Sequence, residues 1–169
     1  MNDTVSILSG SSSEIEYRKR TVQAAKIFIP EFALSLMAEH ADAGLDADRE
    51  IMGLMIGRFY RDECGIYAVV DRPISSKLIS DRFGVRFDRG SMEELFDTME
   101  MGEGECIVGW YHSHLDIGCF MSPTDIETQN GMFGGECGFA LVIDPVRKEM
   151  KVFDSTFDDP KAVDMVVID

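Results

Sequence analysis

Two histidines and an aspartate in the second half of the chain have the types and spacing to bind one metal ion. His112 and His114 lie two positions apart in an apolar segment, and residues two apart on a strand point to the same face. Asp125 follows within the first turn of a helix that we expect to begin at Pro123. Two imidazoles and a carboxylate suit zinc, and three protein ligands leave a fourth position for water, as in catalytic zinc sites. The sequence therefore predicts one zinc ion per chain, bound by these three side chains.

Each part of this pattern also has a purely structural explanation. Ser122, Pro123 and Asp125 form a favourable helix start, with the serine as N-cap and the carboxylate at the positive end of the helix dipole. A His-x-His pair can be two ordinary strand residues. The joint spacing His-x-His-x7-Ser-x-x-Asp is much rarer by chance than either part, because the chain contains only 3 histidines. The combination therefore favours a metal site.

The elements that must position these residues follow from apolar periodicity and from Gly and Pro. We expect strands at residues 26–29, 50–60, 65–70, 106–112, 138–144 and 149–153, with 85–87 as an extension of the sheet. We expect helices at residues 31–41, 91–101 and 123–133, the first ended by Gly44 and the acidic stretch around it. Strands that alternate with helices predict an α/β domain with a mixed sheet and helices packed on it.

Length and composition favour a single globular domain. The 169 residues, 45% of them hydrophobic and 28% charged, are close to globular averages. Residues 1–23 are polar and serine-rich, which predicts a flexible tail, and residues 24–169 are expected to form the domain. No apolar run is long enough to cross a membrane and no secretory signal is present, so we expect a cytoplasmic protein.

The cysteines and the net charge argue against a cysteine zinc site and against nucleic-acid binding. The 4 cysteines form no CxxC pair, so we expect reduced thiols, and their spacing does not support a four-cysteine zinc site. A net charge of −15 argues against a nucleic-acid-binding protein, which needs a basic face. Between Arg89 and Arg147 there are eleven acidic residues and no Lys or Arg. This stretch is either a solvated surface or a surface that faces a cation, such as a metal or a basic peptide.

The chain resembles the JAMM (MPN-plus) zinc metallopeptidases over about residues 24–157. The resemblance rests on His112, His114, Ser122 and Asp125 in the family's spacing, and on Glu50 within Glu-Ile-Met-Gly-Leu-Met-Ile-Gly. The segments Gly-Trp-Tyr-His-Ser-His and Gly-Cys-Phe are most similar to the branch that includes the proteasome-lid deubiquitinase and its archaeal relatives.

The resemblance implies an MPN (cytidine-deaminase-like) fold, a curved mixed sheet flanked by helices. It implies zinc-dependent hydrolysis after the C-terminal glycine of ubiquitin, or of a ubiquitin-like modifier, conjugated to a protein lysine. It assigns His112, His114 and Asp125 as zinc ligands, Glu50 as the catalytic acid/base, and Ser122 as the hydroxyl that stabilises the tetrahedral intermediate. Independently of the resemblance, Glu50 opens an apolar strand, a position where a merely solvated glutamate is less expected.

Two departures from the family pattern bear on partners. Leu115 follows the second histidine where the family commonly has Pro, and the chain ends soon after the domain, without the helical extension that docks the lid enzyme. Incorporation into a proteasome lid is therefore not expected, although the resemblance leaves association with a proteasome open. The segment Ser76–Val85 is our candidate edge for binding an extended modifier tail, with Asp116 or Glu127 attracting its basic residues.

Two other functions remain open from the sequence. One is a non-catalytic MPN scaffold, which the complete ligand set disfavours. The other is a zinc peptidase that processes the C-terminus of a sulfur-carrier protein.

Overall fold

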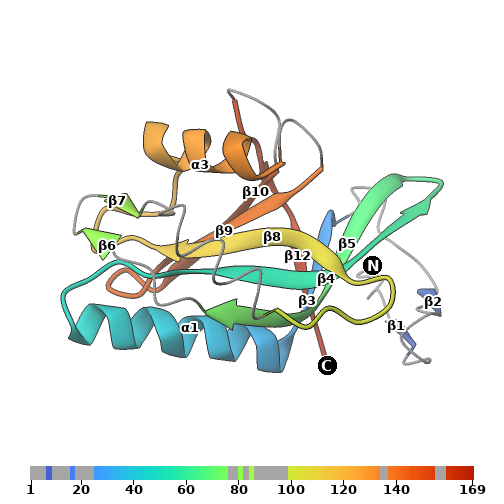
Figure 1. The fold of residues 1–169 in the computed structure, drawn as a ribbon, viewed down its shortest axis with the longest axis horizontal. Helices are drawn as coiled ribbons and strands as arrows, with labels where there is room; N and C mark the ends of the chain where they lie inside the picture. Colours follow the sequence, from blue (N-terminus) through green and yellow to red (C-terminus); the bar gives the residue numbers. More distant parts are fainter. Residues whose placement is uncertain are drawn as a thin grey trace, which may run out of the picture.

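The computed structural model describes residues 25–75, 99–133, 137–154 and 159–169, and the backbone of short strands at 7–8, 16–17, 80–81 and 84–85. The main sheet contains β3 (Ile27–Pro30), β4 (Met52–Asp62), β5 (Gly65–Ser75), β8 (Cys106–Ser113), β9 (Phe139–Asp144), β10 (Glu149–Asp154), β11 (Ala162–Val163) and β12 (Met165–Ile168). Their order is β11-β10-β9-β8-β4-β5-β3-β12. Among the described residues, the helices that pack on this sheet are α1 (Glu31–Asp46) and α3 (Pro123–Phe133). The predicted α/β class with a mixed sheet is confirmed (Figure 1).

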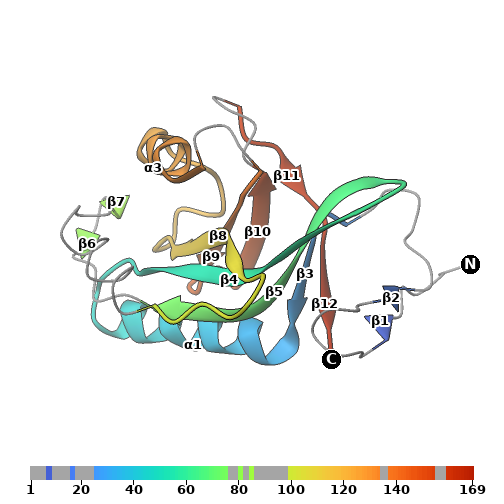
Figure 2. The ribbon, with the colours of Figure 1, turned by 45° about the vertical axis from the view of Figure 1, so that its right-hand side comes forward.

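The sheet is mixed and curls until its two edges come close together. β4 pairs antiparallel with β5 and β8, whereas β8–β9, β3–β5 and β3–β12 are parallel pairs. β11 and β12 lie at opposite ends of the strand order, yet only Asp164 separates them in the chain. Figure 2 shows them as one almost continuous C-terminal strand that crosses from β10 to β3. The C-terminal segment therefore joins the two edges of a nearly closed sheet.

The two helices cover opposite faces of the sheet, with α1 below it and α3 above it in Figure 1. On the α1 face, Met37 packs in one buried cluster with Tyr111 and Leu141. On the α3 face, Trp110 packs with Met52, and Met132 of α3 lies against them. Since neighbouring residues of a strand point to opposite faces, β8 contributes Tyr111 to the first cluster and Trp110 to the second. The side chains at positions 112 and 114 follow Trp110 toward α3.

The first helix is longer than predicted: it continues to Asp46, so Gly44 lies inside it and does not end it. A Cβ at position 44 would lie 2.5 Å from Cγ2 of Ile51, so the residue is glycine where the helix packs closely on the segment after it. Close approach of two segments is a second reason for glycine, besides ending a helix. The first strand, the β4–β5 hairpin, β8, α3 and the β9–β10 pair all lie within a few residues of their predicted positions, although β5 continues to Ser75.

Other predictions on elements were wrong or fall outside the described residues. Val85 does not extend the main sheet but belongs to a separate small sheet, in which β6 (Ser80–Asp81) pairs with β7 (Gly84–Val85). The predicted helix 91–101 lies outside the described residues up to position 98, and residues 99–101 are not helical. β11 and β12 were not predicted. Within the predicted tail, β1 (Ile7–Leu8) pairs with β2 (Glu16–Tyr17).

In the part of the chain that the structure describes, no helix is both long and apolar enough to cross a membrane. All four cysteines are free thiols, and none belongs to the metal-capable group found among the described residues.

Candidate metal centre

Three buried side chains from β8 and α3 converge on one point. Nε2 of His112 lies 3.4 Å from Oδ1 of Asp125, and Nε2 of His114 lies 3.4 Å from Oδ2 of the same carboxylate. One ligand atom from each of the three residues can be chosen so that these atoms all lie within 4.8 Å of one another. All three residues are at most 3% exposed. The structure therefore brings together the three residues that the sequence predicts as zinc ligands.

Asp125 is held in place at the start of α3 by reciprocal hydrogen bonds with Ser122. The Ser122 backbone N–H donates to Oδ2 of Asp125 at 2.7 Å, and the Asp125 backbone N–H donates to the Ser122 hydroxyl oxygen at 3.2 Å. This pairing is a capping box, closed by an aspartate instead of the usual glutamate. The helix-capping explanation of Ser122 is thus confirmed. Because the hydroxyl oxygen only accepts in this bond, its O–H remains able to donate to another group.

The loop after β8 sets the tautomer of His114. Nδ1 of His114 lies 2.8 Å from the Gly118 carbonyl oxygen, which can only accept, so Nδ1 carries the proton. In the neutral imidazole, Nε2 then carries the lone pair, faces Asp125 and is available to a metal. A metal-binding histidine almost always donates its other N–H in this way.

His112 provides the test of whether the residues fit a metal. Its side chain is buried, and neither ring nitrogen has a hydrogen-bond partner among the described residues. The 3.4 Å contact from Nε2 to Asp125 is long for a hydrogen bond. An unpartnered buried nitrogen costs about 1–3 kcal/mol, and a cation at Nε2 removes that cost for this atom. The buried donor set of two imidazoles and a carboxylate therefore fits zinc.

Burial and mutual contacts shift the pKa values of the three residues in different directions. Burial lowers the pKa of His112 and keeps the imidazole neutral, as a metal ligand must be. Burial raises the pKa of Asp125, but its contacts with the two histidines and with Ser122 outweigh this, so its pKa is lowered and the carboxylate stays ionised. For His114, burial lowers the pKa, but bonding to Asp125 and to the Gly118 carbonyl outweighs it, and the pKa is raised. The ionised Asp125 thus favours positive charge at Nε2 of His114, which a proton or a metal ion can supply, and metal binding there would release the proton.

Glu50 lies beside this group, at the segment that leads into β4. Met52 pairs with His112, and Ile51 exchanges hydrogen bonds with Ser113: the Ser113 N–H donates to the Ile51 carbonyl, and the Ile51 N–H donates to the Ser113 hydroxyl, both at 2.9 Å. Continuing this register places Glu50 opposite His114. The sequence predicts Glu50 as the first residue of this strand. In the structure β4 begins at Met52, so Glu50 precedes it.

The environment of Glu50 suits proton transfer near neutral pH. The residue is 4% exposed, and burial raises the pKa of its carboxyl to about 7, with His114 opposing the shift and Asp125 adding to it. A carboxyl with a pKa near the working pH is the group that general acid/base catalysis requires. The roles of Glu50 and Ser122 stay predictions, but both residues lie at the predicted centre.

Two further residues support the centre and were not predicted. The Trp110 ring stacks on His112 with centroids 4.4 Å apart and an interplanar angle of 16°. Its indole N–H donates to the side-chain oxygen of buried Gln129, whose amide donates to the Gly138 carbonyl at 3.4 Å. Gln129 lies one helical turn after Asp125 on α3. The i, i+4 spacing was visible in the sequence, but nothing local indicated that a tryptophan two residues before His112 would be the partner.

One carboxylate predicted to attract a basic tail is already paired. Asp116 is exposed, and its Oδ1 accepts a hydrogen bond from Nε of Arg147 at 3.1 Å. Glu127 is exposed on α3. Of the two predicted carboxylates, Glu127 is therefore the better placed to attract an external cation.

Comparisons with known proteins agree with this geometry. A family model described as JAB1/Mov34/MPN/PAD-1 ubiquitin protease matches residues 22–133. The 26S proteasome non-ATPase regulatory subunit 14 of Drosophila melanogaster is 34% identical over 127 residues, which are 73% of this chain and 40% of that protein. The ubiquitin carboxyl-terminal hydrolase RPN11 of Saccharomyces cerevisiae is 32% identical over 128 residues, which are 72% of this chain and 39% of that protein.

Another relative and a solved structure extend the comparison. The COP9 signalosome complex subunit 5 of Debaryomyces hansenii is 30% identical over 128 residues, 73% of this chain and 26% of that protein. The matches thus span 40% or less of the length of these three relatives. The solution structure of protein DSY2949 from Desulfitobacterium hafniense has the same fold, with a TM-score of 0.63 at 22% identity over 85% of this chain and 93% of that one. The chain therefore belongs to the JAB1/Mov34/MPN/PAD-1 family.

Proposed function

We propose that this protein is a zinc-dependent isopeptidase that cleaves the bond after the C-terminal glycine of ubiquitin or of a ubiquitin-like modifier conjugated to a lysine. The observation that carries the proposal is the buried group of His112, His114 and Asp125 with Glu50, whose pKa is about 7, beside it. Relatives named as a ubiquitin carboxyl-terminal hydrolase and as a COP9 signalosome subunit support the choice of reaction.

In this proposal His112, His114 and Asp125 hold the zinc ion. When bound, zinc would supply Lewis acidity and lower the pKa of water toward about 7. Glu50 takes the proton from the attacking water and passes it to the departing lysine amine. The Ser122 O–H donates to the oxygen that becomes negative in the transition state. Burial of Glu50 makes both proton transfers accessible near neutral pH, because its carboxyl gains and loses a proton there.

The direct test is hydrolysis of a ubiquitin-like modifier joined to a lysine side chain, with the full chain as enzyme. We expect cleavage that a chelator abolishes and added zinc restores. A matched substrate with the modifier fused in line to a peptide separates the competing functions. Cleavage of the linear fusion alone would favour processing of a sulfur-carrier protein, and zinc binding without any cleavage would favour the scaffold.

Ser122 offers a test that separates catalysis from helix capping. We expect Ser122→Ala and Ser122→Gly to reduce kcat by about 10²-fold or more, because both remove the hydroxyl donor. Alanine at an N-cap costs about 1 kcal/mol of stability, whereas glycine costs only a few tenths. Equal losses of kcat with unequal losses of unfolding free energy are therefore expected. A glycine variant with wild-type kcat would leave Ser122 with the capping role alone.

The small sheet of β6 and β7 supports the predicted docking edge for the modifier tail. Of residues 76–85, the structure describes the backbone of these two strands, and β7 lies beside α3, the helix that bears Asp125 (Figure 1). We therefore propose that an extended tail adds to this edge on its way to the centre. One relative is named as a 26S proteasome regulatory subunit, which supports an association with a proteasome, and the free cysteines support a cytoplasmic location.

A further inference from the structure

Asp144 is a buried carboxylate at the end of β9 that the proposed reaction does not use. It is fully buried, and its two oxygens accept hydrogen bonds from four backbone N–H groups. Oδ1 accepts from Val146 and Arg147 at 3.1 Å each and from Asp116 at 3.3 Å. Oδ2 accepts from Gly118 at 2.7 Å. Asp144 thus joins the turn after β9 to the loop that follows His114.

The contact with Gly118 leads directly to the metal centre. The N–H of Gly118 points to Asp144, and the carbonyl of the same residue accepts the Nδ1 proton of His114. Gly118 has a φ of +86°, in the left-handed region that glycine adopts without strain. The N–H and the carbonyl of Gly118 belong to the two peptide units on either side of its Cα, so Asp144 holds one unit and His114 bonds to the other. The chain of contacts from Asp144 to Gly118 to His114 is continuous.

Arg147 closes the same loop from outside. Its guanidinium donates to the side chain of Asp116 at 3.1 Å and to the Asp116 carbonyl at 3.0 Å, and its Nε lies 3.9 Å from Oδ2 of Asp144. Asp116 has a φ of +62°, a conformation that aspartate tolerates better than most residues. The loop lacks the proline that the family commonly has after the second histidine. In this chain, side-chain bonds to Asp144 and Arg147 hold it instead.

We propose that Asp144 is a positioning residue that sets the zinc affinity of the centre by orienting the Gly118 carbonyl, and through it the imidazole of His114. The geometry separates this role from simple capping of the turn. The N–H groups of the turn donate to Oδ1, whereas the N–H of Gly118 donates to Oδ2. Burial raises the pKa of Asp144, but the N–H donors outweigh burial and its pKa is lowered, so the acceptor stays ionised. This inference rests on the zinc centre of the proposed function.

Asp144→Asn is the selective test of this role. An Asn carbonyl can still cap the turn, because Asn forms the same side-chain turn as Asp. Its NH2 group then faces the N–H of Gly118, and two donors cannot bond to each other. If the amide flips, three N–H groups lose their acceptor instead. The substitution therefore keeps the size of the side chain while removing the contact that supports His114.

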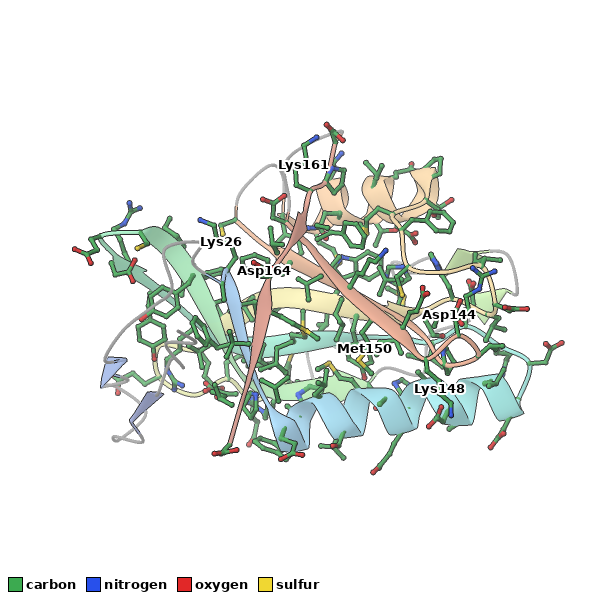
Figure 3. All side chains as sticks on the ribbon, turned by 180° about the vertical axis from the view of Figure 1, so that it is seen from behind. Lys26, Asp144, Lys148, Met150, Lys161 and Asp164 are labelled. Atoms are coloured by element: carbon green, nitrogen blue, oxygen red, sulfur yellow. The ribbon has the colours of Figure 1, made fainter. Side chains whose placement is uncertain are left out.

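The matched control is Asp154→Asn at the other end of the same hairpin. Asp154 also ends a strand and also accepts a backbone N–H through Oδ1, from Lys161 at 3.2 Å. Figure 3 shows Lys161 far from Asp144 and Lys148, which lie together at the turn after β9. Both variants lose one buried or partly buried carboxylate charge near a backbone donor. Only the first lies beside the loop of His114.

Zinc affinity is measured by competition with a coloured chelator, and cobalt affinity by quenching of Trp110, the only tryptophan of the chain, which stacks on His112. We expect zinc binding to weaken about 10- to 100-fold in Asp144→Asn, the range for residues that support a metal ligand, and to stay within about twofold of wild type in Asp154→Asn. Saturating zinc should restore kcat in Asp144→Asn. Affinity unchanged in a folded Asp144→Asn protein would overturn the proposal.

If Asp144→Asn does not fold, Asp144→Glu is the second variant, because it keeps the charge but its longer side chain cannot place the carboxylate oxygens where Oδ1 and Oδ2 lie. We then expect zinc binding weaker than wild type by more than about twofold, and unchanged binding would overturn the proposal. The metal titrations need no substrate. A protein that binds zinc in an Asp144-dependent manner but cleaves no conjugate would refute the proposed function and leave this inference standing.

Discussion

Replacing Glu50 by Gln is expected to reduce turnover by about 10²- to 10⁴-fold while zinc affinity stays close to that of the wild type. The amide has the size of the carboxyl but cannot take up and return a proton, and general acid/base catalysis is typically worth that factor. Zinc binding should survive, because Glu50 is not one of the three converging ligands. The loss should appear in kcat, measured on an isopeptide-linked conjugate at saturating zinc.

The same substitution should not destabilise the fold. Glu50 is 4% exposed, and burial raises its pKa to about 7 because the ionised form is poorly solvated there. A neutral amide avoids that cost, so the unfolding free energy should stay the same or rise slightly. Glu39→Gln, at an exposed position on α1, is the matched control and should keep both kcat and stability. Wild-type kcat in a zinc-loaded Glu50→Gln enzyme would exclude Glu50 as the acid/base.

Replacing Asp125 by Ala is expected to weaken zinc binding by more than about 100-fold, beyond the loss typical of residues that only support a ligand. The substitution removes the only carboxylate of the converging group and the acceptor that ties Ser122 to α3. Two neutral or partly protonated imidazoles then remain, without the negative charge that attracts the cation. Zinc content measured by elemental analysis after dialysis should fall to background.

Thermal unfolding provides a second readout for Asp125. A ligand at about 100 times its dissociation constant stabilises the folded state by about 2.7 kcal/mol. For a domain of this size that corresponds to a rise in Tm of about 5–10 °C. We expect this rise in the wild type and in Asp42→Ala, an exposed aspartate on α1, and no rise in Asp125→Ala. A zinc-dependent rise that persists without Asp125 would contradict its assignment as a ligand.

The local pattern of the chain was sufficient to predict most of the elements around the centre. The β4–β5 hairpin, β8, α3 and the β9–β10 pair are short segments whose apolar periodicity and Gly or Pro boundaries lie in the sequence itself. Gly44 was misinterpreted because a glycine that permits close packing looks the same in sequence as one that ends a helix. A glycine is needed at this position because Ile51, a residue beyond the end of the helix, packs closely against it. β11 has only two residues, and β12 is defined by pairing with β3 at the other end of the chain, so local sequence did not indicate either strand.

What the sequence determined by itself were the types and spacing of the three predicted metal ligands. The two-residue spacing of His112 and His114 on a strand and the place of Asp125 in the first helical turn are consequences of backbone periodicity, which local sequence specifies. Convergence of these side chains on one point, 3.4 Å from nitrogen to oxygen on both sides, required β8 and α3 to pack together.

The surroundings of the centre were decided only by tertiary structure. Burial raised the pKa of Glu50, Gln129 and Trp110 joined α3 to β8, and Asp144 reached across 26 positions of the chain to the loop of His114. Residues that bind a metal carry their chemistry in their own side chains, so type and spacing reveal them. Residues that orient those ligands act through buried contacts between segments far apart in the sequence. Such contacts exist only once the strands and helices have packed together.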